Sequence, residues 1–178
     1  YKNVLVIGAE SLSSLVDWKD RSTCILFGDG AGAVVLRVEE GESYQMVTHS
    51  DGSKGEALTC DTGSFMKMDG QEVFKFAVRQ VPACIAEVME HNHLMAEDID
   101  YFILHQANRR IVEAVAKRMK VELTKFPMNL QEYGNTSSAS IPLLLDEMNR
   151  EGRLKKGQKL VLAGFGAGLS WGASLLEW

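Results

Sequence analysis

The sequence has no long hydrophobic run, no paired cysteine motif and no excess of basic residues. Its longest purely apolar runs are a few residues, far short of the roughly 20 that span a bilayer, so no membrane segment is expected. The three cysteines, Cys24, Cys60 and Cys84, form no C-x-x-C pair, and their odd number argues against a disulfide framework or structural zinc. A formal net charge of -5 argues against a nucleic-acid-binding surface.

A signal peptide and an initiator methionine are also missing from the start of the chain. Tyr1 leads almost at once into the strand-like run "NVLVIGAE". Unpaired cysteines and no signal peptide together favour a reducing cytoplasm. Because a native domain rarely begins inside a strand, the 178-residue chain is expected to be a fragment, or one chain of a cut or split protein.

Apolar, β-rich runs alternate with amphipathic helical segments along the chain. Strands are predicted at residues 4–8 (fully buried), 24–27, 33–38, 45–49, 99–104, 160–165 and 170–176. Helices are predicted at 72–91, kinked or broken at Pro82, at 110–119, and at 137–151, ended by Gly152. Residues 51–70 read as a long functional loop. This order predicts an α/β layered fold with a largely buried mixed sheet.

Two glycine-rich stretches suggest tight turns. "FGDGAGAVVL" (27–36) superficially resembles a phosphate-binding loop, but a Val-rich strand follows it instead of a helix, so a tight turn with Asp29 bonded inside it is the better interpretation. "GFGAGLSWG" (164–172) follows a buried strand, and its little-shielded backbone N–H groups suit either a plain hairpin or an oxyanion hole.

A histidine and an asparagine follow predicted buried segments. "YFILHQANRR" (101–110) places His105 at the carboxyl end of a strand, where α/β sheets locate their sites, although a satisfied core histidine is the simpler alternative. In "YGNTSSAS" (133–140), Asn135 reads alone as a turn residue, with Ser137 and Ser138 as helix caps. Combined with the "GFGAG" turn, these residues describe a site with a neutral base or donor, an amide donor and backbone N–H groups, but no nucleophile.

These four motifs, in this order and spacing, resemble the β-ketoacyl-acyl-carrier-protein synthase III family of condensing enzymes. The resemblance implies a thiolase-like fold of two similar halves, each a five-stranded mixed sheet layered with helices. Residues 1–40 would be the end of the N-terminal half with its crossover strands, and residues 41–178 the C-terminal half-domain. The implied activity is a decarboxylative Claisen condensation of an acyl-CoA primer, such as acetyl-CoA, with malonyl-acyl-carrier protein, which starts type II fatty acid synthesis.

The resemblance also implies roles for individual residues. His105 and Asn135 match two members of a Cys-His-Asn triad, and Ala167 matches the residue whose backbone N–H forms half of an oxyanion hole. Substrate-binding roles fall on Arg21, which would stack on the coenzyme A adenine, and on Phe27, Asn108 and Phe165. Carrier-protein-binding roles fall on Gln106, Ala107, Asn108, Arg109, Arg110 and Lys75. No metal or other cofactor is implied, and coenzyme A enters as a substrate thioester.

The nucleophilic cysteine of the family has no counterpart in this chain. Cys24, Cys60 and Cys84 do not stand at a helix N-terminus, so none is nominated, and the cysteine is expected upstream of Tyr1. The partners implied are acyl-CoA, an acyl carrier protein, the N-terminal half of the same enzyme and a second copy in a homodimer. Thiolases place a second cysteine at the "GFGAG" position and are excluded. A priming synthase of a polyketide or quinolone pathway, and a catalytically silent scaffold, stay open as alternatives.

Overall fold

The computed structural model describes residues 1–41 and 44–178. Its strands and α-helices are β1 (Asn3–Ser11), β2 (Asp29–Arg37), β3 (Met46–Ser50), β4 (Leu58–Thr59), β5 (Lys67–Met68), α1 (Gly70–His91), β6 (Tyr101–Leu104), α2 (Arg109–Met119), α3 (Leu130–Tyr133), α4 (Ser140–Arg150), β7 (Lys159–Gly166) and β8 (Ser170–Glu177). Short 3-10 turns occupy Leu12–Ser14, Gly52–Ala57, Ala96–Asp98, Leu123–Lys125 and Ser137–Ala139. The predicted α/β class is confirmed.

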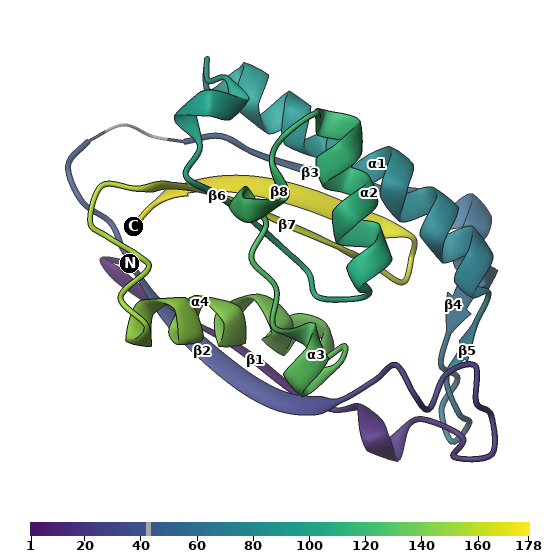
Figure 1. Cartoon of the computed structure of the whole chain (residues 1–178). Helices are drawn as coiled ribbons and strands as arrows, with labels where there is room; N and C mark the ends of the chain where they lie inside the picture. The colour runs from purple at the N-terminus through teal and green to yellow at the C-terminus, as the bar shows by residue number, and fades with distance from the viewer. Residues whose placement is uncertain (42–43) are drawn as a thin grey trace.

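These elements stack in layers around a mixed sheet. The sheet has the order β3-β8-β7-β6, with β6 parallel to β7 and the other neighbours antiparallel. Helices α1 and α2 cover one face, α4 lies on the other, and the separate β1–β2 sheet lies beyond α4 (Figure 1). In the part of the chain that the structure describes, the main sheet has four strands where five were expected.

Alternation along the strands divides the core into two clusters. Phe102 and Val161 pack with α1 and α2, whereas Ile103 and Leu160 point the opposite way and pack with α4. Each of these four side chains has no more than a trace of exposed surface. Helices therefore pack against β6 and β7 on both faces of the sheet and fix the positions of the strand ends.

Helix α1 begins two residues before its predicted start because Asp69 caps it. The Asp69 carboxylate accepts hydrogen bonds of 3.0 Å from the N–H groups of Gln71 and Glu72. The helix then runs on through Pro82, so of the two predicted alternatives, a kink or a break, the break is wrong. Pro82 is buried, and packing of that apolar face offsets the backbone hydrogen bond that proline cannot make.

The strand β1, predicted to be fully buried, is mostly exposed. Leu5 and Ile7 are 59% and 62% exposed, and Gly8 is the buried residue of the strand. Within the described ranges β1 is hydrogen-bonded to β2, and it packs on Ser137–Ala139 and α4, so its other edge and face meet solvent.

Residues 21–26 form successive turns, so the strand predicted at 24–27 is wrong. Asp20 stabilises these turns, because its carboxylate accepts hydrogen bonds of 2.9 Å from the Ser22 N–H and from the Thr23 hydroxyl. Phe27 alone makes a bridge, and its partner is Asn135.

The glycine turn predicted in "GDGAG" is also wrong, because β2 begins at Asp29 and includes all of this segment except Gly28. Gly8 and Gly32 are paired in the β1–β2 register and let the neighbouring chain approach closely. A Cβ on Gly8 would lie 2.4 Å from the Ser138 carbonyl oxygen, and one on Gly32 would lie 2.9 Å from Pro142 Cβ. Asp29 bonds outside the segment, to the N–H (2.8 Å) and hydroxyl (2.5 Å) of Ser13.

Two further segments differ in detail from prediction. The loop expected at 51–70 contains the turns of Gly52–Ala57 and the small β4–β5 sheet. The helix expected from Ser137 opens as a 3-10 turn and becomes α4 only at Ser140, and neither Ser137 nor Ser138 caps it.

Candidate active site

His105 directly follows β6 and is fixed on three sides. Its backbone N–H donates to the Ala163 carbonyl at 2.8 Å, which extends the β6–β7 ladder by one residue. Its ring lies edge-on to Phe165, with centroids 5.3 Å apart. Its Nδ1 lies 2.7 Å from Oγ of Ser140, the first residue of α4. The imidazole is therefore held by the sheet and by α4 together.

This histidine is neutral at physiological pH. Burial lowers its pKa to about 4, and the negative charge of Glu10 opposes that shift only in part. A neutral imidazole carries a single N–H, so it can donate a hydrogen bond from one nitrogen only.

Asn135 is placed beside Phe27 and next to the start of α4. Its backbone N–H donates to the Leu26 carbonyl and its carbonyl accepts from the Gly28 N–H, both at 2.9 Å. Its side-chain Oδ1 accepts from the Ser137 N–H at 2.9 Å. Because a backbone N–H can only donate, the side-chain atom facing it is the oxygen, and the Asn135 Nδ2 is left as a donor.

Glu10 supports this segment from β1. Its carboxylate accepts hydrogen bonds from the N–H (3.2 Å) and hydroxyl (2.5 Å) of Ser138, and the Ser138 hydroxyl is the main cause that lowers the pKa of Glu10. Ser137 has a positive φ of 48°, a conformation that serine rarely adopts. The Asn135 side chain accepts from the Ser137 N–H, and Glu10 accepts from the next residue, Ser138, so Ser137 is held by both of these contacts.

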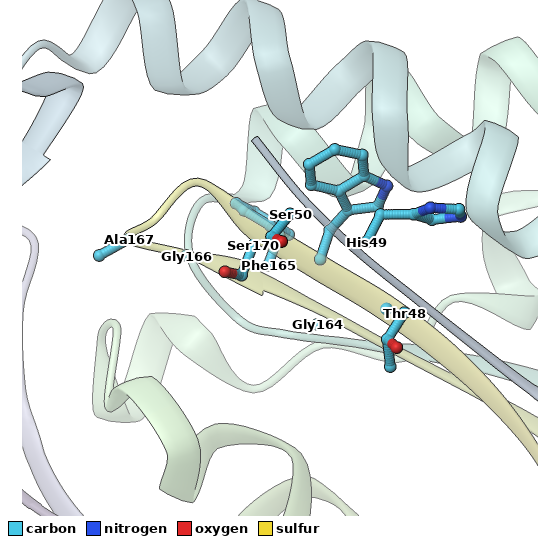
Figure 2. A pocket seen from close by; sticks show the side chains of 10 residues that line it. Thr48, His49, Ser50, Gly164, Phe165, Gly166, Ala167 and Ser170 are labelled. Atoms are coloured by element: carbon cyan, nitrogen blue, oxygen red, sulfur yellow. The ribbon is translucent and has the colours of Figure 1, made fainter. Parts of the chain in front are cut away.

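Ala167 lies at the exposed tip of the β7–β8 turn. Asp51 holds this turn, because its N–H and carbonyl pair with the carbonyl and N–H of Leu169 at 2.8 and 2.9 Å. A pocket of about 610 Å³ opens beside it, lined by residues 48–50, 164–167 and 170–172 (Figure 2).

The two faces of the sheet differ sharply at this pocket. On the face toward α1 the register aligns His49, Trp171 and Phe165. The opposite face carries only small side chains or none, at Thr48, Ser50, Gly164, Gly166, Ser170 and Gly172. A Cβ placed on Gly164 or Gly166 would meet nothing within 4 Å, so the sheet backbone is open to approach there.

The residues predicted to bind the carrier protein differ in burial and in hydrogen bonding. Asn108 caps α2, because its Oδ1 accepts from the Arg110 N–H at 2.8 Å, and Ala107 is half-buried beside it. Gln106 is only 1% exposed and bonds to the Leu104 carbonyl and the Asn129 N–H, so its side chain braces the interior of the chain.

Among the three basic residues of that set, Arg110 is the one without an ion pair in the described chain. Arg109 pairs with Glu113 at 2.7 Å and Lys75 with Glu72 at 2.8 Å. The Arg110 guanidinium instead lies over the ring of Phe74, 5.3 Å from its centroid.

The structure thus puts the His105 ring against Phe165, two residues before Ala167 in the chain, and joins Asn135 to Phe27 by a β-bridge. Arg21 lies apart in an exposed turn, and among the described residues no hydrogen bond or ring contact joins it to these residues. Sequence reasoning missed Ser140 and Glu10. The "SSAS" run gave a signal for Ser140, because it places a hydroxyl at the start of α4, but no local signal pointed to Glu10.

None of the three cysteines lies at the start of an α-helix, where a thiol would be activated. Burial raises the pKa of Cys84 to about 11, so its thiol stays protonated at neutral pH. Cys60 is exposed and Cys24 lies in the turn segment, and neither stands at the start of an α-helix. Over residues 1–41 and 44–178 there is no group of three or more His, Cys, Asp or Glu side chains suited to a metal, and no helix long and apolar enough to cross a membrane.

Models of known protein families match both ends of the chain. The family model described as 3-oxoacyl-[acyl-carrier-protein (ACP)] synthase III C terminal matches residues 89–178, and that of 3-oxoacyl-[acyl-carrier-protein (ACP)] synthase III matches residues 1–55. The chain is 50% identical to the β-ketoacyl-[acyl-carrier-protein] synthase III of Clostridium novyi and 47% identical to that of Synechococcus sp.. These alignments cover 99% of this chain and 59% and 58% of the two relatives, so the chain spans about three fifths of their length.

Solved structures give the same result. The crystal structure of the synthase III from Aquifex aeolicus superposes with a TM-score of 0.96 at 46% identity, covering 99% of this chain and 58% of that one. The priming β-ketosynthase of the R1128 polyketide pathway superposes with a TM-score of 0.92 at 34% identity, covering 99% and 57%. The fold is therefore thiolase-like, as predicted, and the chain belongs to the 3-oxoacyl-[acyl-carrier-protein] synthase III family.

Proposed function

We propose that the complete protein condenses an acyl-CoA primer with malonyl-acyl-carrier protein. In this proposal the chain supplies the hydrogen-bond donors of the active site. A cysteine thiolate takes the acyl group and releases coenzyme A. The malonyl thioester then loses CO2, and the enolate that remains attacks the acyl-cysteine, which frees the thiol and yields 3-oxoacyl-carrier protein. The observation that carries this proposal is the pairing of a neutral His105 with an Asn135 whose Nδ2 is free to donate.

These two groups suit the decarboxylation step. Loss of CO2 places negative charge on the thioester oxygen, and positioned N–H donors stabilise it by about 2.7–4 kcal/mol each. His105 Nε2–H and Asn135 Nδ2–H would both point at that oxygen, from a rigid strand end and a braced turn. A protonated imidazole is not required, which agrees with the lowered pKa of His105.

The open, small-residue face beside Ala167 supports a place for the upstream cysteine. Gly164 and Gly166 leave the backbone uncovered next to the β7–β8 turn, where a segment carrying the cysteine would fit closely. The backbone N–H groups of that cysteine and of Ala167 would hold the tetrahedral oxyanion of both acyl transfers. Residues 1–40 would then complete the N-terminal half of the enzyme, with β1 exposing the edge that joins it, and residues 41–178 form the C-terminal half.

Arg110 is the best candidate to receive the carrier protein, which is acidic in this family. It is exposed, free of ion pairs in the described residues and fixed at the start of α2, two residues along the chain from Asn108 and five from His105. Asn108 and Phe165 would contact the pantetheine arm and the reacting thioester, Phe27 the acyl group, and Arg21 the adenine of coenzyme A. Arg109, Ala107 and Lys75 would lie at the edge of this contact.

The proposed enzyme works in the cytoplasm as a homodimer, without a cofactor other than its coenzyme A substrate. The 34% identity and the TM-score of 0.92 to the R1128 priming β-ketosynthase keep a polyketide-priming role as the second candidate.

Incubation of the complete protein with acetyl-CoA and malonyl-carrier protein tests the proposal. Mass spectrometry of the carrier should show a 3-oxobutanoyl group with the native protein and none with His105→Ala. A panel of longer acyl-CoA primers separates fatty acid initiation from secondary-metabolite priming. Absence of product from every primer with the native protein would instead favour the silent scaffold.

A further inference from the structure

Ser140 has an unusual position for a helix residue, because its side chain is buried against the imidazole of His105. The residue is 2% exposed and begins α4. Its Oγ lies 2.7 Å from His105 Nδ1 and 3.3 Å from the backbone nitrogen of Gln106. The mechanism proposed above gives this hydroxyl no task.

The direction of these two hydrogen bonds follows from their chemistry. The Gln106 N–H can only donate, so it occupies a lone pair of the Ser140 oxygen. The Ser140 hydroxyl hydrogen must then find an acceptor of its own, and His105 Nδ1 is the only one within bonding distance in the described chain. An Nδ1–H tautomer would point its proton at the same oxygen and leave a buried O–H unsatisfied.

We propose that Ser140 is a positioning residue whose hydroxyl donates to His105 Nδ1 and so holds the imidazole as its Nε2–H tautomer. This inference rests on the proposed function, in which Nε2–H is the donor to the enolate oxygen. Asn135 is oriented by the same logic, because the Ser137 N–H occupies its Oδ1 and leaves its Nδ2 to donate. The short run Ser137–Ser140 thus sets the polarity of both donors.

No charged or titratable group in the described residues forms a hydrogen bond with the His105 ring. Glu10 acts on His105 through charge, but its carboxylate is already hydrogen-bonded to Ser138. Phe165 contributes only its ring edge, and the His105 main chain is bonded to Ala163. In the described residues, Ser140 is therefore the one side chain that can select the tautomer.

The test is nitrogen NMR of the complete protein labelled with 15N-histidine, the His105 signals being assigned by their loss in His105→Gln. At pH 7 we expect Nδ1 to show the shift of an unprotonated ring nitrogen and Nε2 that of a protonated one. Ser140→Ala should mix the two tautomers and slow condensation on the order of 10-fold or more, as loss of an orienting partner of a histidine does. Ser140→Thr, which keeps the hydroxyl, should restore the native spectrum.

Ser138→Ala is the matched control, because it removes a nearby hydroxyl that bonds to Glu10 and should leave the His105 tautomer unchanged. A protonated Nδ1 in the native protein would overturn the proposal, and so would an unaltered tautomer in Ser140→Ala. A protonated Nδ1 in the native spectrum overturns the proposal even when a variant fails to fold. The tautomer is read without turnover, so this test also stands when the protein proves not to be a condensing enzyme.

Discussion

At the scale of single residues, the site depends on an imidazole that the fold keeps uncharged. Burial lowers the pKa of His105 from 6.5 to about 4, so between these values the unfolded chain binds a proton that the folded chain does not. The free energy of unfolding should therefore be undiminished above pH 6.5 and should fall as the pH drops through this window. Between pH 7 and pH 5 the loss amounts to about 2 kcal/mol at most.

His105→Gln should remove the part of the fall in the free energy of unfolding, between pH 7 and pH 5, that comes from protonation of His105. Thermal unfolding of the complete protein at pH 7 and pH 5 should show a smaller drop in Tm for the variant than for the native protein. His91→Gln, which changes an exposed histidine at the end of α1, serves as the control and should behave like the native protein. Equal drops for all three proteins would mean that His105 is protonated in the folded state above pH 5.

The second residue-scale prediction concerns Arg110. Arg110→Glu should raise the KM for malonyl-carrier protein at least 10-fold with little change for acetyl-CoA, because the cation is free to meet an acidic partner. The effect should shrink as salt rises, since exposed charges are screened over a Debye length of about 8 Å at physiological ionic strength. Arg109→Glu is the matched comparison and should have a smaller effect, because Arg109 is already paired with Glu113. Losses that are equal for both substrates and independent of salt would contradict the docking role.

At the scale of elements, Gly8 of β1 and Gly32 of β2 set how closely α4 and the turn before it approach the β1–β2 sheet. Gly8→Ala should cost roughly 1–3 kcal/mol of stability, as overpacking does, because its Cβ would meet the Ser138 carbonyl oxygen at 2.4 Å. It should also lower kcat, since that backbone belongs to the segment that orients Asn135. Gly52→Ala makes the same chemical change where nothing lies within 4 Å, and urea unfolding should leave it near the native value. Similar stabilities for both variants would contradict this close packing.

The same elements show what sequence could and could not predict. The strand that ends at His105 and the helices 72–91 and 110–119 were predicted nearly in place, because their apolar periodicity is local. The "GDGAG" segment was misread as a turn, because its glycines serve contacts with Tyr133, Pro142 and Leu143, more than 100 residues away in sequence. The burial of Gln106 and the bond from Ser140 to His105 likewise arise from tertiary contacts that no local pattern records.

At the scale of the whole molecule, the chain exposes apolar side chains along β1 and β2. Val4, Leu5, Val6 and Ile7 of β1 are all at least 43% exposed, as are Val35 and Leu36 of β2. Contiguous exposed apolar strands of this kind mark an interface. They are consistent with the relatives, which extend well beyond the length of this chain.

The 178-residue chain alone should therefore form no stable acetyl adduct with acetyl-CoA and should bind a hydrophobic dye strongly. Cys84 has too high a pKa to attack, and Cys24 and Cys60 lack a helix N-terminus that would activate them. Adding the proposed upstream half should restore acylation and suppress dye binding. Intact-mass measurement after incubation reads the adduct directly, and acetylation of any of the three cysteines in the isolated chain would mean that the nucleophile has been misplaced.

The role of His105 as donor to the enolate oxygen is tested most directly by measuring the two half-reactions of the complete His105→Ala enzyme separately. Retention of labelled acetyl on the protein should stay close to native, because acylation uses the cysteine and the Ala167 oxyanion hole. Release of CO2 from malonyl-carrier protein should fall by about 10²–10³-fold, the cost of removing one such donor. A parallel fall in both half-reactions would contradict this assignment and would make His105 the base that activates the thiol.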